Sequence, residues 1–113
     1  MPKTRVILEL GSGNDLHGSD YTKAALRAVQ DALHHSSLSF VRSLKIDKTK
    51  IDVEVTIGVQ RPEQVDIEKI KKSLPLGNVT VSAIKGGLDV ADPANNDAAV
   101  IASAAIAVRI EMP

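Results

Sequence analysis

The chain has 113 residues, enough for one domain, and its 14 Lys and Arg residues balance 14 Asp and Glu residues. This neutrality gives no electrostatic reason to expect nucleic acid or an anionic membrane as a partner. There is no cysteine, which excludes disulfides and thiol chemistry, and one Tyr and one Phe leave the core to aliphatic residues. With no apolar run that could span a bilayer and no leader-type segment, we expect a single cytoplasmic domain over residues 1–113.

The first half of the chain predicts a strand, a helix and a second strand. The run RVILEL, residues 5–10, is apolar enough for a buried strand. Residues 21–35 have helical periodicity with mostly alanines on the apolar side, and Ser19 or Asp20 is expected to cap the helix. The segment FVRSLKI, residues 40–46, is a further short strand candidate.

The second half of the chain predicts three more elements and one long loop. IDVEVTIGV, residues 51–59, alternates strictly between apolar and polar residues, as a half-buried strand does. VDIEKIKKSL, residues 65–74, reads as a short amphipathic helix that Pro75 and Gly77 end. NVTVSAI alternates again, KGGLDVADPANND is expected to be a polar loop within residues 85–98, and AAVIASAAIAVRIE is the last strand.

The predicted order is β-α-β-β-α-β-β. It indicates an α+β two-layer sandwich in which one mixed sheet carries both helices on one face. The other face either meets water or packs against sister subunits, and its polar residues would be Asp52, Glu54, Thr56, Thr80 and Ser82. Because the core is thin and the last strand is rich in small residues, we expect a homo-oligomer. These small residues are Ala102, Ser103, Ala104, Ala105 and Ala107.

The densest cluster of Gly, Asp and His is GSGNDLHGSD, residues 11–20, between the first strand and the first helix. A strand that runs into a glycine-rich loop and a helix N-terminus presents N–H groups to an anion. Gly11 and Gly13 would let the backbone turn sharply and approach a ligand. Lys23 and Arg27, one helical turn apart, would add charge for a phosphate or carboxylate. The spacing matches neither the dinucleotide fingerprint nor a P-loop.

Asp15 and His17 form a candidate metal site. Two positions apart in an extended segment, they project to the same side, and carboxylate with imidazole is a common pair for zinc or a related divalent ion. A complete site needs two or three more ligands, and His34 and His35 at the far end of the helix would reach it only across an interface. The alternatives are a backbone hydrogen bond for His17 and solvation at the helix C-terminus for the other two histidines.

Two classes of function are compatible with these residues. In a small-molecule enzyme or binding protein, His17 would be the general acid or base, since imidazole exchanges protons near neutral pH, and Asp15 would orient it. The residues that hold the anionic ligand would be Gly11, Gly13, Gly18, Lys23 and Arg27. In a non-catalytic assembly subunit, the motif is a structural turn and Asp15 and His17 make satisfied polar contacts. Convergence on an open pocket favours the first class, and burial in hydrogen bonds favours the second.

The spacing GxGxDxHG resembles the N-terminal signature of a family of uncharacterised conserved hypothetical proteins. The five fixed positions are Gly11, Gly13, Asp15, His17 and Gly18. The resemblance covers the whole chain, including TKAALRAVQDALHHSSL. It implies homology, and no activity is carried over with it.

The chain is more distantly similar to methylerythritol cyclodiphosphate synthase, whose Gly-x-Gly-x-Asp-x-His pattern binds a divalent metal through the residues that correspond to Asp15 and His17. The segments KIDVEVTIGVQRPEQV, GNVTVSAIKGGL and AAVIASAAIAVRI follow the order of that enzyme's closing elements. The similarity implies a chorismate-mutase-like sandwich and a homotrimer with sites between subunits. Arg27 stands where the enzyme has a third metal-binding His, and the hairpin before the helix is missing. We therefore do not carry over the cyclase activity, and we expect an anion to bind better than a bare metal ion.

Overall fold

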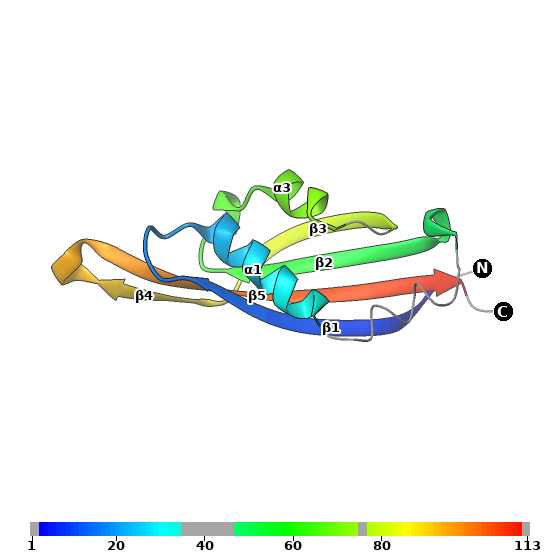
Figure 1. The fold of residues 1–113 in the computed structure, drawn as a ribbon, viewed down its shortest axis with the longest axis horizontal. Helices are drawn as coiled ribbons and strands as arrows, with labels where there is room; N and C mark the ends of the chain where they lie inside the picture. Colours follow the sequence, from blue (N-terminus) through cyan, green and yellow to red (C-terminus); the bar gives the residue numbers. More distant parts are fainter. Residues whose placement is uncertain (1–2, 35–46, 75–76, 112–113) are drawn as a thin grey trace.

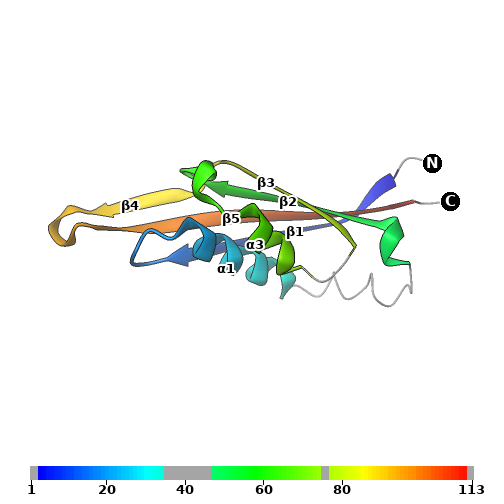
Figure 2. The same ribbon diagram turned by 90° about the horizontal axis from the view of Figure 1, so that it is seen from above.

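A five-stranded mixed sheet forms the body of the protein, and two helices lie on one of its faces (Figures 1 and 2). The computed structural model describes residues 3–34, 47–74 and 77–111. The strands follow the order β1-β5-β2-β3, with β4 also paired to β5. Their bounds are β1 Lys3–Asp15, β2 Ile51–Val59, β3 Asn78–Lys85, β4 Leu88–Asp92 and β5 Asp97–Glu111. The helices are α1 Tyr21–Leu33 and α3 Ile67–Lys72, and short 3-10 turns cover Lys48–Lys50, Pro62–Gln64 and Pro93–Asn95.

This architecture confirms the predicted α+β sandwich with both helices on one face. Only β2 and β3 run parallel, and every other strand pair is antiparallel. The core lies between the sheet and the helices and consists of aliphatic side chains, since alternate residues of β2 and β5 point to that side. Its largest fully buried members are Ile51, Ile57, Ile70, Ile106, Val29, Val55, Val59, Val100 and Val108.

The structure corrects two predictions, the end of the first strand and the absence of regular structure within residues 85–98. The first strand was expected to end at residue 10, but β1 continues to Asp15, so the glycines of the motif lie within a strand. The segment expected to be a polar loop contains β4 and a 3-10 turn, because β4 pairs with the start of β5. The strand expected over residues 40–46 lies outside the described residues.

The chain reaches β4 by a crossing made of two glycines. β2 pairs with β5 up to Gly58, opposite Ser103, and β4 takes over the same side of β5 from Leu88, opposite Ile101. At Gly87 the backbone has a φ of +64°, and a side chain there would lie 2.1 Å from the carbonyl oxygen of Ile101. Only glycine fits such a crossing. As a result β4 and the start of β5 extend beyond the helix-covered part of the sheet (Figure 1).

Helix α1 packs on β1 backbone to backbone. A methyl group at Gly11 would lie 2.3 Å from the carbonyl oxygen of Ala28, and one at Gly13 would lie 2.3 Å from the Ala28 nitrogen. The helix contributes Ala24, Ala28 and Ala32 to this contact, and all three are completely buried. Small residues on both elements therefore allow an approach that larger side chains would prevent.

Replacing Gly13 with alanine should destabilise the protein by about 3 kcal/mol or more, because the new methyl group meets backbone atoms that cannot move aside. Gly58→Ala is the matched control, since its methyl group would find its nearest neighbour at 3.5 Å, an ordinary contact. We expect the free energy of unfolding of the Gly58→Ala variant to lie within about 1 kcal/mol of the wild-type value. Urea unfolding of both variants measures the difference, and equal stability of the two would contradict the close-packing account.

Candidate functional site at the β1–α1 junction

Asp15, the last residue of β1, has its carboxylate buried between the strand and helix α1. The side chain is 4% exposed and lies 3.5 Å from Lys23 Nζ and 3.9 Å from Arg27 Nη1. The backbone N–H of Asp20 donates a hydrogen bond of 3.0 Å to its second oxygen. The structure thus brings Lys23 and Arg27 beside Asp15, as the helical spacing predicted, and there they neutralise the carboxylate.

The N-terminus of α1 has its own cap. Asp20, one of the two predicted candidates, is the N-cap residue, and its side chain accepts a hydrogen bond of 3.0 Å from the backbone N–H of Lys23. The first turn therefore already interacts with one carboxylate of the chain, and a second one, Asp15, lies next to it.

Two side chains of α1 cover the outer edge of β1. Arg27 donates a hydrogen bond of 2.7 Å to the carbonyl oxygen of Asn14, and the carboxylate of Asp31 accepts one of 3.0 Å from the N–H of Ser12. An edge strand exposes unpaired backbone groups that attract other strands, and these contacts satisfy two of them. Arg27 therefore has a structural partner in addition to Asp15.

His17 lies beside Asp97 at the start of β5. Its Nδ1 lies 3.0 Å from a carboxylate oxygen of Asp97, and its side chain is 87% exposed. The other oxygen of Asp97 accepts hydrogen bonds from the N–H groups of Gly18 at 3.0 Å and Ala98 at 2.8 Å. The sequence predicted a polar loop over KGGLDVADPANND but did not single out Asp97 as a partner of His17, because the two residues are 80 positions apart.

These hydrogen bonds lower the pKa of the Asp97 carboxyl: the backbone N–H of Gly18 has the largest effect, followed by the N–H of Ala98 and by His17. A depressed pKa in the folded state means that Asp97 stabilises the fold above its ordinary pKa and ceases to do so as the pH falls through the lowered one. Stability should therefore decrease below about pH 4.

The Asp97→Asn variant should lose part of this acid dependence. Unfolding by urea at a series of acidic pH values measures it, and the other carboxylates provide the unchanged background in both proteins. If wild type and variant have the same dependence of unfolding free energy on pH, Asp97 does not hold the junction through its charge.

Tyr21 and Asp89 make a second link between α1 and β4. The buried Tyr21 hydroxyl donates a hydrogen bond to a carboxylate oxygen of Asp89. Burial, and then the hydrogen bond and negative charge of Asp89, raise the pKa of the Tyr21 hydroxyl. The other oxygen of Asp89 is buried and has no hydrogen-bond partner among the described residues. The sequence offered no indication of this pair, because neither residue belongs to a recognisable motif.

The geometry adds no ligands to the predicted metal site. Asp15 and His17 have different partners, and within residues 3–34, 47–74 and 77–111 no group of three or more His, Asp or Glu residues could hold a metal ion. His34 is exposed at the C-cap of α1, and His35 lies outside the described residues.

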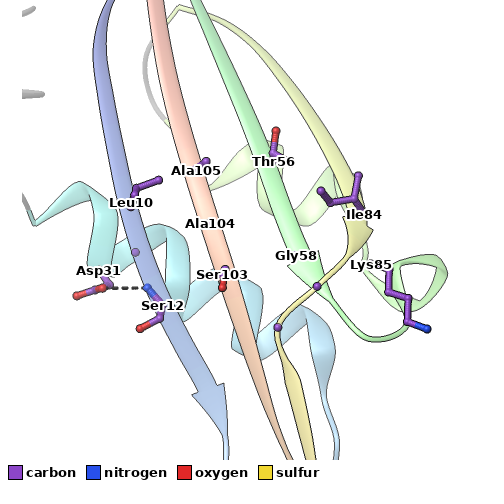
Figure 3. A pocket seen from close by; sticks show the side chains of 13 residues that line it. Leu10, Ser12, Asp31, Thr56, Gly58, Ile84, Lys85, Ser103, Ala104 and Ala105 are labelled. Atoms are coloured by element: carbon purple, nitrogen blue, oxygen red, sulfur yellow. Dashed lines mark hydrogen bonds between the residues drawn. The ribbon is translucent and has the colours of Figure 1, made fainter.

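A hollow lies elsewhere, on the face of the sheet opposite α1 and α3. Its volume is about 620 Å³, and side chains of β1, β5, β2 and β3 surround it (Figure 3). Of the residues predicted to bind a ligand, only Gly11 is part of its lining. Neither Asp15 nor His17 contributes to it, so the motif does not converge on this hollow.

The protein is thus a small α+β sandwich in which the glycines of a motif at the end of β1 pack against α1. The polar residues of the same motif pair with other residues of the chain. The chain belongs to the Lin0512_fam family of conserved hypothetical proteins, which matches residues 5–108. This confirms the family predicted from the GxGxDxHG spacing.

One solved structure is similar over the full length. It is the crystal structure of an FtsZ-like protein of unknown function from Nostoc punctiforme PCC 73102, which is 37% identical, with a TM-score of 0.83 and 99% of each chain covered. No functionally curated protein matches the chain. The similarity to methylerythritol cyclodiphosphate synthase therefore stays a prediction from sequence. Neither helix in the described part of the chain has the length and apolar character that crossing a bilayer requires.

Proposed function

We propose that the chain is a non-catalytic assembly subunit that forms a homo-oligomer through the face of its sheet opposite α1 and α3. This face carries no helix in the described part of the chain and is called the helix-free face. The observation that carries this proposal is where the exposed large apolar side chains lie. Six are exposed in the described part of the chain, and all but Leu16 belong to the helix-free face. These five residues are Leu8, Leu10, Ile84, Leu88 and Val90.

The register of the strands places these side chains on one face. Leu8 and Leu10 lie opposite Ala107 and Ala105 of β5, and alternate residues of β5 from Val100 to Ile110 are buried under the helices. The intervening residues of β5, which include Ala105 and Ala107, therefore point to the open side of the sheet. Leu8 and Leu10, which pair with them, point to the same side. An apolar surface that spans several strands is typical of an interaction site.

The charges on this face do not oppose contact between copies. Lys3 pairs with Asp52 at 2.9 Å and Arg109 pairs with Glu54 at 2.8 Å, so each of these charges already has an opposite neighbour. The chain has no net charge, which means that two copies have no overall repulsion to overcome. A second copy of the chain can therefore contact this face without charge repulsion.

The geometry of the motif also supports a non-catalytic function. Asp15 is buried among Asp20, Lys23 and Arg27, and His17 is bound to Asp97, so each has a partner within the chain. This matches the arrangement expected of a structural turn. A trimer is the assembly that the similarity to methylerythritol cyclodiphosphate synthase favours.

Replacing Leu10 with aspartate should weaken the assembly at least tenfold, because the interface would then bury an unpaired charge. Leu16→Asp is the matched control, since Leu16 is 61% exposed and Leu10 is 63% exposed, but Leu16 lies in the loop after β1. Sedimentation over a range of concentrations gives the stoichiometry and the dissociation constants. A wild-type protein that is monomeric at micromolar concentration would contradict the proposal. An equal increase in the dissociation constant for both variants would also contradict it.

A second candidate function is binding of a small anion, and one observation favours it. Lys23 and Arg27 are 51% and 52% exposed and lie 3.5 Å and 3.9 Å from the buried carboxylate of Asp15. With the Asp20 carboxylate at the cap the cluster has no net charge, but both cationic groups keep an exposed outer side close to the N-terminus of α1. A phosphate or carboxylate group fits this site better than a bare cation does.

Phosphate should then raise the thermal stability of the wild type more than chloride does at equal ionic strength. At one hundred times the dissociation constant the stabilisation is about 2.7 kcal/mol. The Lys23→Gln variant should lose the specific part of this gain, and zinc should give little stabilisation in either protein. Stabilisation by zinc alone, with no response to phosphate, would favour the metal site at Asp15 and His17 instead.

A further inference from the structure

We propose that a hairpin arm of one copy lies in a trough on the helix-free face of a second copy. The arm consists of residues 88–101, which include β4, the 3-10 turn and the start of β5. The trough is the hollow whose walls are Leu10 on β1 and Ile84 on β3 (Figure 3). The inference depends on the proposed assembly and specifies which surfaces meet in it.

The floor of the trough consists of small residues in two adjacent rows. In one row Leu10 lies opposite Ala105, which in turn lies opposite Thr56. In the next row Ser103 lies opposite Gly58, which pairs with Ile84. The two large side chains therefore stand at opposite corners, and the low residues between them leave the hollow open (Figure 3).

The width of the trough suits a hairpin. Leu10 and Ile84 stand on strands that are three inter-strand spacings apart, or about 14 Å. The two strands of a hairpin are about 5 Å apart, so both fit between the walls with their side chains directed at the floor. Small floor residues such as Ala105 and Ser103 would accept larger apolar side chains from above.

The arm presents such side chains and is held on its other side. Leu88 is 54% exposed and Val90 is 50% exposed, and both belong to the helix-free face because they lie opposite Ile101 and Ala99. Tyr21 holds the opposite face of the arm through Asp89. A two-stranded hairpin is only marginally stable alone, so an arm that displays apolar residues gains from a partner surface.

Charges at the rim and at the arm are of opposite sign. Lys85 is exposed at the end of β3 and lines the rim of the trough, and no ion pair involves it among the described residues. Because it pairs with the buried Val59, its side chain leaves β3 on the helix side, and its amine would reach an arm in the trough around the edge of the sheet. Asp92 is exposed at the tip of the arm and accepts a hydrogen bond only from Asn95 in that part of the chain. An arm seated in the trough of a second copy would bring the two charges together.

Val90 of the arm cannot reach the trough of its own chain. Val90 pairs with Ala99 and Thr56 pairs with Ala105, so the two side chains are separated by six residues of β5, about 20 Å. The contact therefore joins two different surfaces of two copies. If each copy places its arm in the trough of the next copy around an axis, the copies form a closed ring, and the smallest such ring is a trimer. If two copies each place their arm in the trough of the other, they form a dimer.

Disulfide trapping tests this placement, because the natural chain contains no cysteine. Val90→Cys and Thr56→Cys in one chain should give covalent dimers and larger species on a non-reducing gel after mild oxidation. An internal disulfide is excluded, since its two Cα atoms must lie within about 7 Å. The control pair is Val90→Cys with Glu68→Cys, because Glu68 is exposed on α3 and thus on the opposite face. This pair should stay uncrosslinked.

Charge reversal provides a second measurement that needs no exact disulfide geometry. Lys85→Asp and Asp92→Lys should each raise the dissociation constant of the assembly about fivefold, and the double variant should restore it. An oligomer of unchanged mass that shows neither the Val90–Thr56 crosslink nor this rescue overturns the arm placement and leaves the assembly proposal standing. A wild-type protein that sediments as a monomer overturns both.

Discussion

The close contact between α1 and β1 is the constraint on which the rest of the structure depends. At Gly11 and Gly13 the strand has no side chain on the helix side, and the alanines of α1 rest directly on its backbone. This short distance lets Arg27 and Asp31 reach the outer edge of β1. It also encloses the carboxylate of Asp15. A larger side chain at either glycine would lift the helix and break these contacts together.

The motif GSGNDLHG thus has two structural halves. Its glycines seat the helix on β1, and the residues after Asp15 hold the start of β5 through Asp97, which accepts hydrogen bonds from Gly18 and lies beside His17. The second half fixes the base of the arm relative to the body. A motif that resembles a ligand loop in sequence therefore connects the helix to the base of a projecting hairpin, and the proposed contact with another copy would depend on this connection.

In the described part of the chain, α1 and α3 cover one side of the sheet and leave the other side open. The helices bury the alternate residues of β2 and β5, while the opposite alternation carries small, polar and exposed apolar residues. In a domain with so few aromatic residues, burial of this second face in an assembly would add the apolar contact that one helix layer cannot supply. The proposed assembly would therefore also contribute to the stability of the fold.

The sequence by itself determined the fold class, the family and the strands and helices with strong periodicity, and it narrowed the cap of α1 to Ser19 or Asp20, because alternation and helical spacing are local properties. It also placed Lys23 and Arg27 near Asp15, since one helical turn fixes their relation. Only the tertiary structure decided that β1 continues through the glycines, that β4 replaces β2 beside β5, and that His17 binds Asp97 rather than Asp15. These features depend on strand register between segments far apart in the chain, and no local pattern of residues encodes which distant backbone will lie opposite.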